Sequence, residues 1–244
     1  MKQQIMSEFR KFRTTRSAWS LLAGTLGLIA LGVVAVLWES NHTTLAAPLA
    51  DQPVLHIALS LTWVFVMILG LRSFTDEFRN GSIVPTLLAD PHRRRVLAAK
   101  LAAVGAAAVL FTFAVAGLTL AIWLPWLAAK GVAIDVAVAP LAVWFGRLLL
   151  IDLLFAAIGV GVGLAVRHQV AAIVGSLVVI TVVENLMDAM APSIARFLPA
   201  AGAWAVAGLG GAFMRPIGGA LVLVGWALGA VVVGAFLMER RDIV

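Results

Sequence analysis

The sequence has no cysteine and few charged residues for its length. Only 12% of its 244 residues are charged and 62% are hydrophobic, whereas soluble domains carry about 25% charged residues. Without cysteine the chain cannot form a disulfide framework, a thiolate nucleophile or a cysteine-based metal site. The four histidines are scattered and show no metal-binding spacing (His42, His56, His92, His168). The composition therefore excludes several classes of site.

Motifs for nucleotide binding and hydrolysis are also missing. The dipeptide Gly-Lys does not occur, so the chain has no P-loop, and it has neither a GxSxG elbow nor a zinc-protease motif. Ser176 is the only plausible nucleophile in an apolar segment, and no histidine at a matching depth could activate it. The net charge of +6 lies beside apolar segments and not in a separate basic domain. An intramembrane enzyme and a nucleic-acid-binding protein are thus both disfavoured.

Six segments are long and apolar enough to cross a membrane as helices. A span needs roughly 20 apolar residues, and the mean hydropathy of the whole chain is +1.04. The predicted spans are residues 18–38, 54–71, 101–124, 141–166, 170–190 and 217–238. The first is too long for the apolar region of a cleaved signal peptide, so we expect it to be retained. The sequence therefore predicts an all-α membrane protein with six transmembrane helices.

Basic residues are distributed unevenly between the two sides of these spans. One side has the basic residues of segments 2–16 and 72–100, together with Arg167, Arg240 and Arg241. The other side has only three (Lys130, Arg196, Arg215). Because cytoplasmic loops of membrane proteins are enriched in lysine and arginine, both termini are predicted to be cytoplasmic.

The N-terminal segment, residues 1–17, has a helical pattern of its own. Ile5, Phe9 and Phe12 recur at the spacing of one helix face, and basic residues occupy the other directions. This pattern predicts an amphipathic helix that lies along the inner membrane surface. The alternative is a solvated basic tail that only sets the topology.

Two other patterns concern helix packing. The segment 191–216 contains three prolines and apolar stretches, and it predicts short helices at the outer surface that re-enter the membrane. Small residues that favour close helix packing recur in the third, fourth and sixth spans (Ala99, Ala103, Ala107; Gly159, Gly161, Gly163; Gly225, Gly229).

Five polar residues lie within or near the predicted spans, where a charge is costly and often functional. They are Arg147, Asp152, Glu184, Asn185 and Asp188. Arg147 and Glu184 fall at comparable depths in the fourth and fifth spans, so an ion pair between them is possible. Such a pair could hold two helices in register, line a translocation path or relay protons.

The interval 72–100 is the longest polar stretch between spans, and it also carries apolar residues. Asp76 and Glu77 are predicted near a helix start, where negative charge is favourable. Asn80-Gly81 is predicted to end that helix, Ser82 to begin a second short one and Asp90-Pro91 to break it. A basic, partly amphipathic loop of this kind is predicted to dock onto a cytoplasmic partner.

Several motifs in this loop and elsewhere resemble those of ABC-2 type exporter permeases. The loop carries EFRNGSI at residues 77–83, TLLA at 86–89, PHRR at 91–94 and AK at 99–100. The N-terminal SEFRKFRTTRS at residues 7–17 is similar to the opening of the same family, and VRHQVAAI at residues 166–173 also fits. Val183-Glu184-Asn185-Leu186 and, after it, Arg196-Phe197-Leu198-Pro199 fit as well.

The resemblance implies a six-helix permease subunit of an ATP-driven exporter in the bacterial cytoplasmic membrane. It implies a coupling helix, seated in an ATPase, that is formed by the loop (Phe74, Asp76, Glu77, Phe78, Arg79, Gly81, Ser82, Thr86). Two separate ATPase subunits would bind ATP and Mg, so this chain needs no cofactor and catalyses nothing. A second permease copy or a related permease would complete the exporter.

The resemblance also assigns the remaining segments. Residues 1–17 would be the connecting helix, and 191–216 would form the outer gate. The polar residues of the spans would line the path of a hydrophobic or amphipathic substrate, such as a drug, an antibiotic or a lipid. The alternative function is a secondary transporter driven by ions or protons through Arg147, Asp152 and Glu184.

Overall fold

The computed structural model describes residues 16–45, 47–48, 51–89, 92–132, 138–209 and 214–240, and these contain no β-strand. The long helices are α2 (Arg16–Glu39), α4 (Pro53–Arg79), α6 (Arg93–Ala129), α7 (Val138–Val166) and α12 (Pro216–Arg240). The fifth span is one continuous helical segment made of α8 (Gln169–Val178), a π-helix (Val179–Val183) and α9 (Glu184–Met190). The short helices are α3 (His42–Leu45), α5 (Ile83–Ala89), α10 (Pro192–Ala195) and α11 (Pro199–Ala207).

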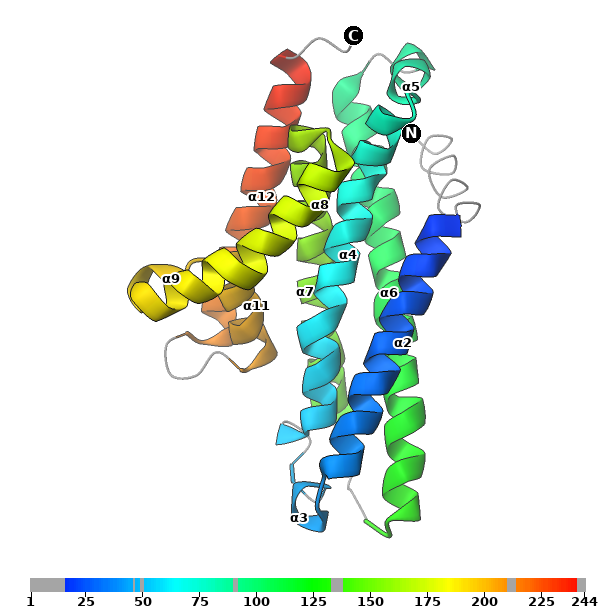
Figure 1. Cartoon of the computed structure of the whole chain (residues 1–244), viewed down its shortest axis with the longest axis vertical. Coiled ribbons are helices and arrows are strands. Elements are labelled where there is room, and N and C mark those ends of the chain that lie inside the picture. Colours follow the sequence, from blue (N-terminus) through cyan, green and yellow to red (C-terminus); the bar gives the residue numbers. More distant parts are fainter. Residues whose placement is uncertain are drawn as a thin grey trace.

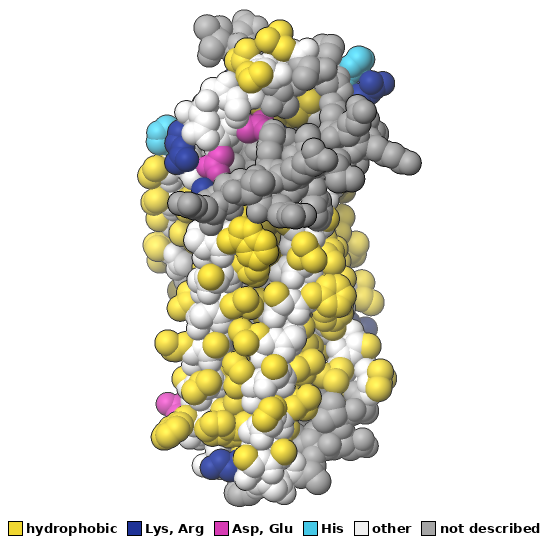
Figure 2. All heavy atoms as spheres, turned by 90° about the vertical axis from the view of Figure 1, so that its right-hand side faces the viewer, with side chains coloured by type: hydrophobic (Ala, Val, Ile, Leu, Met, Phe, Trp, Pro, Cys, Tyr) yellow, Lys and Arg dark blue, Asp and Glu magenta, His cyan; other side chains and the backbone are white. Residues whose placement is uncertain are grey.

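Six helical segments in the described part of the chain are long and apolar enough to cross a membrane. This confirms the predicted all-α class and the predicted number of spans. Hydrophobic side chains cover the middle of the face shown in Figure 2, and charged side chains lie mostly toward its upper and lower ends. The chain is a multi-pass membrane protein.

The helices form an elongated bundle with two distinct ends (Figure 1). One end holds α5, the start of α6 and the end of α12, and we call it the α5 end. The other holds α3 and the end of α6, and we call it the α3 end. Helices α4 and α7 lie at the centre, α2 and α6 pack on one side of them, and α12 packs against α7 on the other. The fifth span leans away from this bundle and is the least buried of the six.

Glycines on α7 allow α4 and α12 to approach its backbone closely. A Cβ atom at Gly159 would collide with the carbonyl oxygen of Met67 on α4, and one at Gly163 would collide with that of Leu71. A Cβ atom at Gly161 would collide with the backbone of Ala230 on α12. The predicted packing role of these three glycines is confirmed, because only glycine leaves room for a neighbouring backbone there.

The glycines predicted to pack in the sixth span have no such role. Gly225 and Gly229 lie on α12 with nothing within 4 Å of a Cβ atom. They line an open, apolar cavity described below. The expected small-residue contact is therefore wrong for this pair within the described part of the chain.

The interval 72–100 is more helical than the sequence predicts. Helix α4 continues to Arg79 and α6 begins at Arg93, so only residues 80–92 lie between them, and α5 occupies part of these. Asp76 and Glu77 are at the end of α4, not near a helix start as predicted. The helix extends because its last turns pack against α6: Phe74, Thr75 and Glu77 are buried.

Two predicted segments are described only in part or not at all. The amphipathic helix with Ile5, Phe9 and Phe12 and the predicted break at Asp90-Pro91 lie outside the described residues. Segment 191–216 folds into α10 and α11, with residues 210–213 outside the described part. Helix α11 packs on α12 through the close pair Gly202 and Gly219.

Candidate functional site

The hairpin at the α5 end is shaped by a helix stop at Asn80. The Asn80 N–H donates to the carbonyl of Asp76 at 3.0 Å, and Gly81 then adopts φ 67°, which glycine accommodates without strain. Ile83 is buried and anchors α5 on the bundle, whereas Leu88 is 80% exposed. The hairpin thus presents an apolar residue away from the protein, as a docking element would.

A buried ion pair supports this hairpin from inside. The Lys100 Nζ atom lies 2.8 Å from Oε1 of Glu77, and the two side chains are 1% and 7% exposed. Lys100 also donates to the carbonyl of Ser73 at 2.9 Å and lies 5.0 Å from the centroid of the Phe74 ring. Glu77 therefore faces α6 and not the outer surface of the hairpin. Its predicted coupling role can act only through the end of α4.

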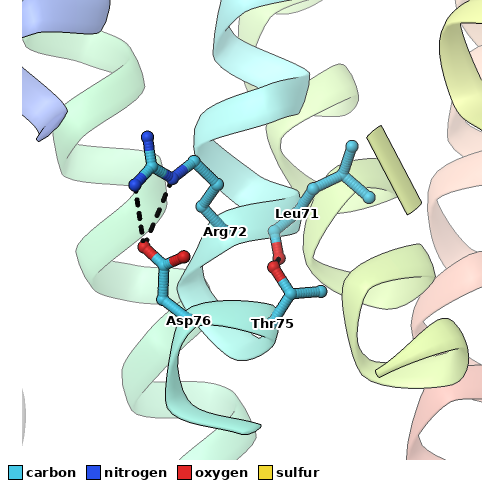
Figure 3. A network of polar contacts seen from close by, with 4 residues as sticks. All are labelled: Leu71, Arg72, Thr75 and Asp76. Carbon is cyan, nitrogen blue, oxygen red and sulfur yellow. Dashed lines mark hydrogen bonds and ion pairs between the residues drawn. The ribbon is translucent and has the colours of Figure 1, made fainter. Parts of the chain in front are cut away.

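The remaining predicted coupling residues lie around the same end. Asp76 accepts from the Nε and Nη2 atoms of Arg72 at 3.2 Å, and the Thr75 hydroxyl donates to the Leu71 carbonyl (Figure 3). Arg79 and Gly81 are exposed, Ser82 is half-buried and Thr86 belongs to α5. Four of the eight predicted residues point into the protein or along α4 (Phe74, Asp76, Glu77, Phe78), so the docking surface is smaller than the motif.

Phe78 connects this end to the fifth span. The guanidinium carbon of Arg167 lies 5.1 Å from the centroid of the Phe78 ring, a cation–π contact. Arg167 adopts φ 61° at the turn between α7 and α8. The neighbouring His168 caps α8, because its Nδ1 atom accepts from the Ala171 N–H at 3.3 Å. The end of α4 and the start of α8 are therefore in direct contact.

Arginines at the start of α6 bind the end of α12. Arg93 donates to the carbonyl of Met238, and Arg94 forms an exposed ion pair with Glu239 at 2.8 Å. Positive charge at a helix C-terminus is favourable, because the last carbonyls there lack partners within the helix. The α5 end thus holds α4, α6 and α12 together.

A cavity of about 530 Å³ with both polar and apolar walls lies between α4, the fifth span and the α10–α11 segment. It is lined by Glu184, Asn185 and Asp188, three of the five polar residues that the sequence places on a path. Other polar residues also line it (Ser60, Thr181, Arg196). We call it the outer cavity, because it lies farther from the α5 end than the second cavity does.

An apolar cavity of about 820 Å³ lies between α7, α8 and α12. Its lining is aliphatic and aromatic except for Ser176 and Glu184. The Trp226 indole, which also lines it, donates to the carbonyl of Phe197 at 2.8 Å. We call it the inner cavity because it extends to Val166 and Ala171, toward the α5 end. Aliphatic walls of this kind bind apolar groups.

The predicted ion pair between Arg147 and Glu184 is wrong. Glu184 is 6% exposed, and its Oε2 atom accepts from the Ala200 N–H, in the first turn of α11, at 2.8 Å. Arg147 instead donates to the carbonyl of Ala207, the last residue of α11, at 3.3 Å. The two charges bind opposite ends of one nine-residue helix, a length of about 13 Å at 1.5 Å per residue.

This arrangement follows the dipole of α11. A helix N-terminus carries unpaired N–H groups and partial positive charge, and its C-terminus carries unpaired carbonyls and partial negative charge. The carboxylate is at the first end and the guanidinium is at the second. Comparable depth in the membrane suggested the pair, but it could not show that a short helix from another segment lies between the two residues.

Asp152 lines neither of these two cavities, nor the third cavity described below. Its side chain is fully buried, and its Oδ2 atom accepts from the Thr112 hydroxyl at 2.8 Å. The contact joins α7 to α6. Arg147 lines a separate cavity of about 330 Å³ with His56 and Trp144. Two of the five predicted path residues therefore do not line the cavity that holds the other three.

The Thr112–Asp152 contact leads to a test of stability. We expect Thr112→Val to lower the free energy of unfolding by about 1–3 kcal/mol, because a buried carboxyl group loses its donor. Denaturation in detergent micelles measures this. Thr181→Val is the control, because that exposed hydroxyl bonds only to the Leu177 carbonyl of its own helix. Equal stability of the two variants would contradict a structural role for the contact.

Some contacts of this arrangement could not be predicted from the sequence. The partnership of Lys100 with Glu77 spans two helices, and no spacing rule connects them. The contact of Phe78 with Arg167 and the bond of Trp226 to Phe197 also join segments far apart in the chain. The motifs include Glu77, Phe78, Lys100 and Arg167, but the sequence does not show which of them contact one another.

Comparison with known proteins agrees with this geometry. The family model described as ABC-2 family transporter protein matches residues 4–185, about three quarters of the chain. The chain belongs to this family. The match includes the α4–α6 hairpin, the fifth span up to Asn185 and both ends of the Phe78–Arg167 contact. The sequence resemblance is therefore confirmed.

The family defines the general role of this ABC-2 protein. It is a membrane transport component that works with ABC ATPase partners and is generally not itself catalytic. No curated protein matches the sequence.

Proposed function

We propose that this ABC-2 protein is the permease subunit of an ATP-driven exporter in the bacterial cytoplasmic membrane. The observation that carries the proposal is helix α5, which presents the exposed apolar side chain of Leu88 at an end of the bundle rich in arginine. Arg79, Arg94 and Arg95 are exposed at that end. Cytoplasmic segments are enriched in such residues, so the α5 end and both termini face the cytoplasm.

The energy source in this proposal is a pair of separate ATPase subunits that bind ATP and Mg. Each ATPase contacts α5, and its movement reaches the bundle through the last turns of α4. From there the Glu77–Lys100 pair passes the movement to α6, and the Phe78–Arg167 contact passes it to α8. A second permease copy, or a related permease, completes the exporter.

The substrate in this proposal is hydrophobic or amphipathic, such as a drug, an antibiotic or a lipid. The inner cavity offers almost only aliphatic and aromatic contact, which suits an apolar body. The outer cavity adds Asn185 and Asp188, which suit a polar end group or water. The two cavities follow one another along the bundle, starting from the α5 end, as a transport path would.

The docking of α5 is tested by Leu88→Asp. In the proposed complex this side chain fills an apolar groove, so a buried charge should weaken ATPase binding by more than about tenfold. The measurement is the ATP-hydrolysing subunit that copurifies with the tagged permease, quantified by mass and by ATPase activity. Val138→Asp is the matched control, because Val138 is 81% exposed and is the first residue of α7, outside the α4–α6 hairpin.

Three outcomes would contradict the proposal. One is an undiminished ATPase partner on the Leu88→Asp protein, and another is an equal loss with Val138→Asp. The third is transport at full rate in vesicles that contain this chain alone and an ion gradient, which would support the secondary transporter instead.

A further inference from the structure

Helix α11 is held at its two ends by parts of the protein that differ in how firmly they are packed. Arg147, which binds the C-terminal end, lies on α7 at the centre of the bundle. Glu184, which binds the N-terminal end, lies on the fifth span, the least buried of the six. One end of α11 is thus fixed to the core, and the other is fixed to the helix that has the fewest neighbours.

The body of α11 stays with α12. Gly202 and Gly219 bring the two backbones into close contact, and Trp226 of α12 binds the carbonyl of Phe197 just before α11 begins. If the fifth span moves outward, α11 therefore remains on α12 and α7. Among the contacts that must then break is the one between Glu184 and the Ala200 N–H.

This contact lies on the boundary between the two cavities. Glu184 and Ile180 line both the inner and the outer cavity. Residues 197–199 line the inner cavity, and the adjacent residues 200–201 line the outer one. The bond from Glu184 to Ala200 therefore lies in the wall between an apolar space and a space with both polar and apolar walls.

The backbone beside Glu184 is irregular in a way that permits a change. The π-helix Val179–Val183 ends immediately before it. Single π-helical turns within α-helices are uncommon and occur often at functional sites. A return of this turn to α-helical spacing would rotate Glu184 relative to α8. The start of α8 is in turn tied to the hairpin through Arg167 and Phe78.

We propose that the Glu184–Ala200 contact is a latch that closes the passage between the inner and outer cavities. Outward movement of the fifth span breaks the contact and joins the two cavities. The inference rests on the proposed function in one respect, that the two cavities together form the transport path. Glu184 is a positioning residue in this scheme: it holds α11 in place and does not itself carry the substrate.

The absence of cysteine from the chain permits a direct test. Ser176→Cys places a single thiol in the inner cavity, and Asn185→Cys places one in the outer cavity. Each is made with Glu184 intact and in the Glu184→Ala background. The probe is a membrane-impermeant maleimide added from the outside of oriented vesicles, and the measurement is the rate of thiol labelling.

We expect Glu184→Ala to increase the labelling rate at position 176 by about tenfold or more, because the hydrogen bond from the Ala200 N–H no longer holds the passage closed. Labelling at position 185 should not change. Asp188→Ala is the matched control, because Asp188 lines the same outer cavity one helical turn away and makes no bond to α11 in the described structure. It should leave labelling at position 176 at the original rate.

An unchanged rate at position 176 in Glu184→Ala would overturn the latch, and so would an equal increase with Asp188→Ala. If Glu184→Ala does not fold, Glu184→Leu takes its place, because its apolar side chain cannot accept a hydrogen bond from the Ala200 N–H. The same increase is then expected, and no increase would overturn the proposal.

The labelling needs neither ATP nor substrate. Failure to copurify an ATPase would contradict the exporter but leave this result intact. A negative labelling result would remove the latch and leave the exporter in place.

Discussion

Replacing Lys100 with methionine will lower the free energy of unfolding by about 3–5 kcal/mol, because it removes the cation that lies beside the buried carboxylate of Glu77. The Nζ–Oε1 distance is 2.8 Å and both side chains are almost fully buried. Little water reaches the site to replace the lost cation. Denaturation in detergent micelles, followed by tryptophan fluorescence, measures the loss.

A double variant distinguishes the loss of the ion pair from a packing defect around it. Replacing both residues, with Glu77→Leu and Lys100→Met together, should recover most of the lost stability, because a hydrophobic pair of similar volume needs no desolvation of charge. Glu77→Leu alone should be as damaging as Lys100→Met alone. The recovery in the double variant is the result that a simple packing defect would not produce.

The exposed pair Arg94–Glu239 supplies a matched control with the same distance of 2.8 Å. Exposed ion pairs contribute little to stability, because water and salt screen them. Arg94→Met should therefore unfold at nearly the same denaturant concentration as the unmodified protein. If Lys100→Met behaves like Arg94→Met, the buried pair does not stabilise the hairpin, and its part in transmitting movement must be abandoned.

Gly159→Leu will prevent the α4–α7 interface from forming. Even a Cβ atom at this position collides with the carbonyl oxygen of Met67 and approaches the backbone nitrogen of Leu71. A backbone cannot rotate away as a side chain can, so the two helices must separate. Gly159→Ala should cost about 1–3 kcal/mol or more from this overpacking, and Gly159→Leu should yield no folded protein on size-exclusion chromatography in detergent.

Gly146→Ala is the control in the same helix. A Cβ atom there has nothing within 4 Å, and alanine has the higher helix propensity, so a change of about 0.5–1 kcal/mol toward greater stability is expected. Opposite signs for the two alanine variants would establish that contact with α4, and not helix propensity, decides the outcome. A stable Gly159→Leu protein would show that α4 and α7 do not pack as closely as the structure has them.

The hairpin shows how far sequence reasoning reached. Asn80 and Gly81 mark the end of a helix by their own chemistry, and the structure ends α4 there. The sequence did not show that α4 continues through Arg72, Asp76 and Glu77. These residues are polar, and polar residues usually leave a bundle. They remain helical because Lys100 on another helix neutralises Glu77, a contact that no local pattern reveals.

The polar residues of the spans also show what the sequence could not predict. Their cost in lipid identified them as candidates, and Glu184, Asn185 and Asp188 do share one cavity. Arg147 and Asp152 were equally costly, yet they bind α11 and Thr112. Hydropathy gives the depth of a residue but not the direction in which its side chain points.

The sequence by itself determined the membrane class, the six spans, the turn at Gly81 and the family. These depend on local composition and short-range geometry, which the chain carries wherever it folds. Only the tertiary structure decided that Glu184 and Arg147 hold opposite ends of α11, that Lys100 neutralises Glu77, and that two cavities meet at one carboxylate. These depend on which helices lie side by side, and that choice is made by close packing at a few glycines of α7 that no single segment can specify alone.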